Sequence, residues 1–278
     1  MKKIKLIVAF VSVITLMFAF AACGSGEGNE ESSVNAAPEK HQLAYPDGYD
    51  TTSSGASSYD GWCDDANSKY FKINDYYNMK SEGTLHILEN FETYQQSTEY
   101  TCGPSSAYMV LNWFKGDTKK YDELTIAEMS DTSDTTGVGV DGLTKFFEEI
   151  GWHVDSYGDS AAGAFDDAED PLLAFEEFCI ENIDNGVPVM VDWIDWDGHW
   201  QVIIGIDTCQ NDNSSDDVLI LADPYDTSDQ WQDGYYTFSA ERFFYMWHEG
   251  ACIGDAVPDI NPYIVAMPQD KYEELNKQ

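Results

Sequence analysis

Three short apolar runs in the second half of the chain carry a pattern typical of β-strands. They are rich in β-branched residues, are bounded by Asn, Asp, Gly or Pro, and cover residues 187–194, 200–206 and 218–222. Apolar runs of this length with turn residues at both ends favour buried strands over helices. The pattern therefore predicts three strands in this part of the chain.

A helical period appears earlier in the chain. In residues 105–114, Tyr108, Leu111 and Phe114 recur every three residues and so lie on related faces of a helix. The pattern predicts four further helices, at residues 121–130, 141–150, 171–185 and 240–247. Helices first and an antiparallel sheet later predict an α+β fold. The roughly 200 residues that follow Tyr59 are enough to bury one full core.

The first residues of the chain have the form of an export signal. Residues 1–5 are basic, and residues 6–22 are apolar apart from Ser12 and Thr15. A basic start and an apolar run slightly short for a membrane-spanning helix are typical of a secretory signal peptide. The polar residues that follow, up to residue 58, are rich in Gly, Ser, Glu, Asn and Pro, so they predict a flexible tether.

The end of the export signal resembles the lipobox of bacterial lipoproteins, because Ala21 and Ala22 precede Cys23 directly. In that family the peptide is cut before the Cys, which carries the lipid, and Leu usually stands where this chain has Phe20. The resemblance implies a signal peptide at residues 1–22, a lipid anchor at Cys23, and a protein held at the outer surface of the cell membrane. An ordinary cleaved signal, or an uncleaved anchor, is the alternative.

The domain organisation then follows from these segments. We expect the signal peptide at 1–22, the tether at 23–58 and one folded domain at 59–278. Aromatic residues become dense from Tyr59 onward, which supports the last boundary.

Composition and charge exclude two classes of protein. The chain has 278 residues, 14 Lys+Arg, 51 Asp+Glu and a formal net charge of −37, and 14% of it is aromatic. This much aromatic surface excludes a disordered acidic tail, and the negative charge repels nucleic acid. Loss of residues 1–22 removes three of the 14 basic residues and none of the 51 acids, which leaves −40. Such a field favours a basic peptide partner.

The segment around Cys102 is the strongest chemical signal in the sequence. Cys102-Gly103-Pro104 stands where a loop turns into the predicted helix, and Pro suits a first helical turn. A helix N-terminus favours the thiolate, which is the nucleophilic form of Cys. Six residues before Cys102, Gln96 offers an amide N–H that can face a developing oxyanion. Gln95 is the alternative donor.

A base and its partner follow in the predicted sheet. His199 comes directly after Gly198 at the start of one strand, and Asp223 comes at the end of the next, followed by Pro224. A carboxylate beside an imidazole fixes its tautomer, which is the third role in a catalytic triad. Asp192, Asp195 and Asp197 precede His199 closely, and their charges raise the pKa of an imidazolium.

Gln96, Cys102-Gly103-Pro104, Gly198-His199 and Asp223-Pro224 together resemble the C-39-like branch of the papain-like cysteine peptidases, over about residues 85–267. The resemblance implies a papain-like α+β fold with the nucleophile at a helix start. It also implies Cys102 as nucleophile, His199 as general base and acid, Asp223 as the residue that orients His199, and Gln96 as oxyanion donor. The best-known members cleave leaders after a double glycine and are fused to exporters. We do not expect that specificity to transfer, because residues 1–278 contain no exporter-like segment.

Two other functions remain open at this point. The same site suits acyl transfer, as in phytochelatin-synthase-like proteins, and the fold also suits a non-catalytic module that binds peptide or cell wall. The resemblance implies no cofactor and no metal. We expect His86, His153 and His248 to be surface or packing residues.

The other cysteines and one acidic loop leave further questions. Cys63, Cys179, Cys209 and Cys252 allow three disulfide pairings, but their wide spacing fits buried thiols equally well. The loop at 207–217 has the oxygen density of a calcium site but lacks the Gly and Glu of an EF-hand, so a solvated hairpin loop is favoured.

Overall fold

A computed structural model describes most of the chain beyond the expected signal. The described residues are 37–61, 64–158, 160, 162–209, 214–248 and 260–277. The expected signal peptide at 1–22 and the expected lipidation site Cys23 lie outside them. Residues 36–278 form one compact unit.

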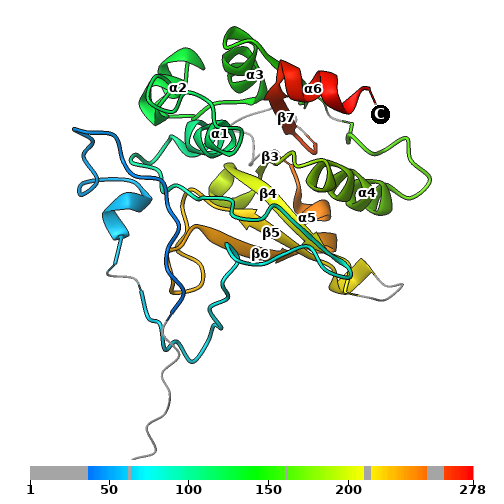
Figure 1. Cartoon of the computed structure of the whole chain (residues 1–278), viewed down its shortest axis with the longest axis horizontal. Helices are drawn as coiled ribbons and strands as arrows, with labels where there is room; N and C mark the ends of the chain where they lie inside the picture. The colour runs from blue at the N-terminus through cyan, green and yellow to red at the C-terminus, as the bar shows by residue number, and fades with distance from the viewer. Residues whose placement is uncertain are drawn as a thin grey trace, which may run out of the picture. The chain divides into compact units, whose positions relative to one another are not determined.

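This unit consists of helices packed on an antiparallel sheet (Figure 1). The α-helices are α1 (Cys102–Trp113), α2 (Glu123–Met129), α3 (Val140–Glu149), α4 (Pro171–Asp184), α5 (Ala240–Met246) and α6 (Gln269–Leu275). The strands are β1 (Leu85–Ile87), β2 (Trp152–Tyr157), β3 (Val189–Trp193), β4 (His199–Asp207), β5 (Val218–Ala222), β6 (Tyr235–Ser239) and β7 (Tyr263–Pro268). Short 3-10 turns are η1 (Ala56–Tyr59), η2 (Asp195–Asp197) and η3 (Ser214–Asp216). The predicted α+β fold class is confirmed.

All the described strands form one sheet, in the order β2-β7-β3-β4-β5-β6, with β1 paired to β4. Each described pairing is antiparallel; Trp193 lies opposite His199, and Val202 lies opposite Ala222. Every residue of β3 is buried, as is almost all of β4, so the two central strands are covered on both faces. Because both faces of these strands are buried, their sequences are almost continuously apolar.

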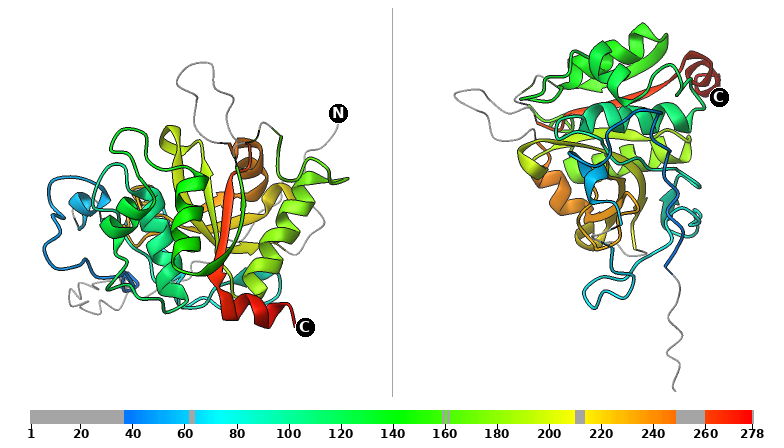
Figure 2. Two further views of the ribbon diagram at one scale, coloured as in Figure 1. Left: turned by 90° about the horizontal axis from the view of Figure 1, so that it is seen from above. Right: turned by 90° about the vertical axis from the view of Figure 1, so that its left-hand side faces the viewer.

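Helices cover both faces of the sheet. On one face α1, α2 and α3 pack over Met190, Val202 and Ile264, and on the other α4 and α5 pack over Val191 and Leu221. Figures 1 and 2 show α1, α2 and α3 together on one side of the sheet and α5 on the opposite side. Alternate residues of each strand thus enter two separate cores, as the pleat of a strand requires.

Residues 37–58, which the sequence places in the expected tether, pack on the folded unit. The backbone N–H of Leu43 donates to the carbonyl of Thr93 at 2.8 Å, and Lys40 forms an ion pair with Asp64 at 2.6 Å. Ala56 in η1 is fully buried. The expected flexible tether at 23–58 is therefore wrong for residues 37–58, because these contacts hold them on the folded unit; residues 23–36 lie outside the described residues. Within the described part, no helix has the length and apolarity that crossing a bilayer requires.

Candidate active site

Cys102 is the first residue of α1, as the motif predicts. Thr101 is the residue before the helix, and Gly103 brings the helix close to its neighbours. A Cβ on Gly103 would lie 2.5 Å from Val138 Cγ1 and 3.1 Å from Trp200 Cδ1, so only glycine fits. Ser106 Oγ donates to the carbonyl of Trp200 at 3.1 Å and fixes α1 against β4. The Cys-Gly segment therefore sits against the strand that begins with His199.

His199 is the first residue of β4, directly after the tight β3–β4 connection. Gly198 has φ 127°, a conformation that favours glycine, and the side chain of His199 is buried. His199 Nε2 lies 2.8 Å from Asp223 Oδ1. That contact leaves Nδ1 as the ring nitrogen available to another partner.

Asp223 follows β5 directly and is held by backbone groups on both sides. Its Oδ1 also accepts a hydrogen bond from the backbone N–H of Tyr225 at 2.8 Å, and its own N–H donates to the carbonyl of Gly234 at 2.8 Å. The carboxylate is buried and cannot easily move away from His199. Because β4 and β5 are antiparallel, the end of one strand lies beside the start of the other, which brings these two residues together.

The pKa of His199 depends on both Asp223 and Cys102. Burial alone lowers the pKa of the imidazole, but the charge of Asp223 and its hydrogen bond outweigh burial and raise the pKa well above 6.5. The side chain of Cys102 also acts on the imidazole and raises this pKa further. The structure therefore joins His199 to Asp223 by a hydrogen bond and places the Cys102 side chain near enough to affect the imidazole.

Asp195 is the acidic neighbour of this group. Burial and the charge of Asp223 raise its pKa, while the nearby His199 opposes the shift. Its charge therefore acts on His199, as expected from the sequence. The side chain of Asp197 lies outside the described residues.

Gln96 lies in the segment that leads into α1. Its side chain forms a hydrogen bond with Thr98, and not with Cys102, His199 or Asp223. Its Nε2 donates to the carbonyl of Thr98 at 2.8 Å, and its Oε1 has no hydrogen-bond partner among the described residues. A primary amide has two N–H groups, so one bond to Thr98 leaves the second for a substrate oxygen. The backbone N–H of Gln96 donates to the carbonyl of Pro224 at 2.8 Å, which fixes this segment beside Asp223.

Gln95, the alternative oxyanion donor, is instead tied to the segment that carries Asp223. Its Nε2 donates to the carbonyl of Asp223 at 2.8 Å, and its Oε1 accepts from the backbone N–H of Asp226 at 3.0 Å and from Gln232 at 3.3 Å. Both ends of the amide are therefore engaged in positioning Asp223.

Glu123 is a buried residue of this region that the sequence alone did not single out. Its carboxylate accepts hydrogen bonds from Tyr94 Oη at 2.8 Å, from the backbone N–H of Ser97 at 2.9 Å and from Thr101 Oγ1. All three donors lie in the segment that carries Gln96 and ends at Cys102. A Glu at the start of an amphipathic helix reads as an exposed residue, so no local signal identifies it.

Residues 88–252, more than half of the chain, match the model of the Peptidase_C39 like family. The chain belongs to this family. The match contains Gln96, Cys102, His199 and Asp223, and the fold of helices on an antiparallel sheet is the papain-like α+β fold of these cysteine peptidases. No curated protein matches the chain.

The remaining cysteines of this C39-like chain differ in their surroundings. Cys179 is a free, fully buried thiol in α4, and burial followed by the charge of Glu176 raises its pKa well above 9.0. Cys209 Sγ lies 3.4 Å from the carbonyl oxygen of Asp216. Cys63 and Cys252 lie outside the described residues, so the disulfide question stays a prediction for them.

The other histidines make contacts away from Cys102. His86 forms an ion pair with Asp184 at 2.7 Å, and His153 stacks on Tyr272. Among the described residues, no group of three or more His, Cys, Asp or Glu side chains is placed to hold a metal ion. The expected hairpin loop at 207–217 joins β4 to β5, and its residues 210–213 lie outside the description.

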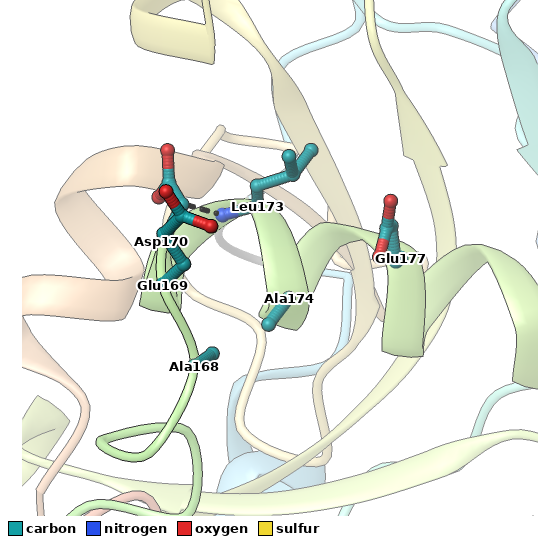
Figure 3. A pocket seen from close by; sticks show the side chains of 6 residues that line it. All are labelled: Ala168, Glu169, Asp170, Leu173, Ala174 and Glu177. Atoms are coloured by element: carbon teal, nitrogen blue, oxygen red, sulfur yellow. Dashed lines mark hydrogen bonds between the residues drawn. The ribbon is translucent and has the colours of Figure 1, made fainter.

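A surface pocket lies at the start of α4 (Figure 3). It encloses about 500 Å³ and is lined by Ala168, Glu169, Asp170, Leu173, Ala174 and Glu177. Asp170 caps the helix by accepting from the backbone N–H of Leu173, so part of its acidity has a structural role. None of Cys102, His199, Asp223 or Gln96 lines it.

Proposed function

We propose that this protein is a cysteine peptidase that hydrolyses peptide bonds with Cys102 as nucleophile. The hydrogen bond of a buried imidazole to Asp223, together with the effect of the Cys102 side chain on the pKa of that imidazole, carries the proposal. Because the raised pKa of His199 favours the imidazolium, its proton can come from the Cys102 thiol, which leaves the nucleophilic thiolate. Membership of a cysteine-peptidase family supports the same reaction.

The reaction proceeds through two tetrahedral intermediates. The Cys102 thiolate attacks the scissile carbonyl, and the second N–H of the Gln96 amide stabilises the resulting oxyanion. The His199 imidazolium gives its proton to the leaving amine, the C–N bond breaks, and a thioester remains on Cys102. His199 then takes a proton from water, the hydroxide attacks the thioester, and the acid leaves as the thiolate re-forms. Asp223 keeps the imidazole in one orientation throughout.

We further propose that the enzyme acts outside the cytoplasm, anchored to the membrane by lipid on Cys23. The export signal at residues 1–22 and the small residues before Cys23 support this location. The partner is then a peptide or protein substrate met at the cell surface, and the negative charge of the chain favours a basic one.

Selective alkylation tests the assignment of Cys102. Iodoacetamide near neutral pH should modify Cys102 faster than the other thiols, and His199→Ala should slow that modification by about 10- to 100-fold because the proton acceptor is lost. Peptide mapping by mass spectrometry gives the rate at each Cys. His153→Ala, which removes a histidine stacked on Tyr272, is the matched control and should leave the rate unchanged. Equal modification of all the thiols would contradict the assignment.

A further inference from the structure

An exposed tryptophan lies beside the candidate active site without a role in the chemistry. Trp196 is 66% exposed, whereas Trp193 and Trp200 on either side of it in the sequence are each 2% exposed. A side chain this exposed contributes little to the core, and aromatic side chains are enriched at surfaces that bind a partner. Trp196 therefore calls for an explanation other than packing.

The backbone at Trp196 is also held in an unfavourable conformation. Its φ is 54° and its ψ is 21°, in the left-handed region that side chains with a Cβ rarely adopt. Backbone strain of this kind persists where the surrounding structure holds it, and it concentrates at binding and catalytic sites. The strained residue lies three positions before His199.

Three aromatic rings form a continuous surface at this point, which we name the aromatic shelf: Trp196, Tyr225 and Tyr59. The ring centroids of Trp196 and Tyr225 are 5.5 Å apart, and those of Tyr225 and Tyr59 are 6.2 Å apart. Tyr225 Oη donates to Glu99 Oε2 at 3.0 Å, and the charge of Glu99 helps to raise the Tyr225 pKa, after burial. The exposed carboxylate of Glu99 thus lies at the edge of the shelf.

Trp196, Tyr225 and Glu99 each come from a segment that carries a candidate catalytic residue, whereas Tyr59 comes from the segment 37–61. Trp196 is three positions before His199, Tyr225 is two positions after Asp223, and Glu99 is three positions before Cys102. Since consecutive Cα atoms are about 3.8 Å apart, these residues lie within about 11 Å of the triad. The backbone of Trp196, Tyr225 and Glu99 therefore lies close to the three residues at which a substrate must react.

The chemistry of the surface suits a cationic side chain. Aromatic faces attract cations, and a carboxylate beside them adds charge. Within the described part, no Lys, Arg or His forms an ion pair with Glu99, and no cation lies over the ring of Trp196 or Tyr225. Asp195, whose charge acts on His199, adds to the negative potential beside Trp196.

We propose that Trp196, Tyr225 and Glu99 form a substrate subsite that takes a Lys or Arg side chain of the peptide next to the bond that Cys102 attacks. This subsite rests on the proposed peptidase function. The cation lies over the aromatic rings and against the Glu99 carboxylate. The aliphatic part of the Lys or Arg side chain covers the exposed indole of Trp196.

Cleavage of paired peptides tests the subsite. The probe is a set of peptides that carry Arg at each position around one scissile bond, each matched to a peptide with neutral citrulline at that position. We expect wild-type protein to prefer Arg at one position, and Trp196→Ala and Glu99→Gln to lower kcat/KM for that peptide by about five- to tenfold. The loss for the citrulline peptide in the Glu99→Gln variant should be clearly smaller than the loss for the Arg peptide. Tyr245→Ala, which removes a tyrosine that is 71% exposed on α5, is the matched control and should change neither.

The outcomes separate this inference from the proposed function. Equal losses for Arg and citrulline peptides in both variants would overturn the cationic subsite in favour of an apolar one, and so would the absence of any preference for Arg. If no peptide is cleaved, binding of the same pairs to Cys102→Ala decides the question. Tighter binding of Arg that Glu99→Gln removes supports the subsite, and equal binding of both members of each pair overturns it.

Discussion

Two opposed effects act on the pKa of the His199 side chain. Burial disfavours its charged form, whereas the Asp223 carboxylate, 2.8 Å away and itself buried, favours it, and the carboxylate prevails. A buried ion pair of this kind depends on good geometry, because each charge alone is costly in the interior. The backbone bonds of Asp223 to Tyr225 and Gly234 supply that geometry.

The pH dependence of stability should reveal this pair. A histidine whose folded pKa lies above its ordinary 6.5 stabilises the fold fully below 6.5, and the stabilisation is lost as pH rises through the folded pKa. Asp223→Asn should therefore lower the free energy of unfolding by roughly 1–3 kcal/mol near pH 6, and the difference from wild type should shrink at higher pH. Chemical denaturation of both proteins across this pH range measures it.

An exposed pair of the same kind provides the control. His86 and Asp184 lie 2.7 Å apart, but their side chains are 26% and 53% exposed, so solvent screens the interaction. Asp184→Asn should change the free energy of unfolding by less than about 1 kcal/mol at every pH. A difference for Asp223→Asn that stays constant or grows with pH would contradict a protonated, stabilising His199.

At the scale of elements, the segment 37–61 supports the loop that carries Gln96. The backbone N–H of Ser57 donates to the carbonyl of Gln96 at 3.1 Å, and that of Gly55 donates to Glu99 Oε1 at 2.8 Å. Gly55 has φ 67°, and a Cβ there would lie 2.5 Å from the carbonyl oxygen of Gln96. Close contact between the two backbones is possible only because residue 55 is glycine.

Gly55→Ala should therefore disturb the active-site loop. We expect it to slow peptide hydrolysis, or alkylation of Cys102, by about 10- to 100-fold, because a displacement of about 1 Å at a catalytic group has effects of this size. Gly61→Ala is the matched control, since Gly61 also has positive φ, 80°, but has nothing within 4 Å of its added Cβ. Equal rates for the two variants would show that the contact with segment 37–61 does not position Gln96.

The helices and strands differ in how far the sequence predicted them. The five predicted helices are all present, with boundaries within three residues, because an amphipathic period and local caps define a helix, whereas the short α6 was not predicted. The three predicted strands are present too, but β1, β2, β6 and β7 were not predicted. β7 lies between β2 and β3 in the sheet, far from both in the chain. Such strands owe their pairing to long-range contacts, which local pattern does not encode.

At the scale of the whole molecule, the compact unit at residues 36–278 follows the proposed lipid anchor in the sequence. The chain has 51 Asp+Glu and a formal net charge of −37, so it is strongly negative. A field of this sign repels an anionic membrane surface. If the protein is anchored as we propose, its attachment to the membrane depends on lipid at Cys23, because the charge of the domain opposes it.

Cys23→Ala should release the protein from the membrane. Without the Cys there is no site for the lipid, so we expect the protein in the medium and not in the membrane fraction. Fractionation followed by immunoblotting measures the distribution. Ser25→Ala, two residues further along the same segment, is the control and should leave the protein with the membrane. Retention of Cys23→Ala in the membrane fraction would contradict the lipid anchor.

The sequence by itself determined the fold class and indicated Cys102, His199 and Asp223, because each of these residues stands at an element boundary with a local signature. Only the tertiary structure decided which of two adjacent glutamines faces which partner: Gln95 is bound to the segment of Asp223, and Gln96 contacts Thr98. It also decided that Glu123 is buried and that Trp196 meets Tyr225. The physical reason is that these roles depend on contacts between segments up to 130 residues apart, roughly. Composition and periodicity predict the helix or strand to which a residue belongs, but not its contacts with distant segments.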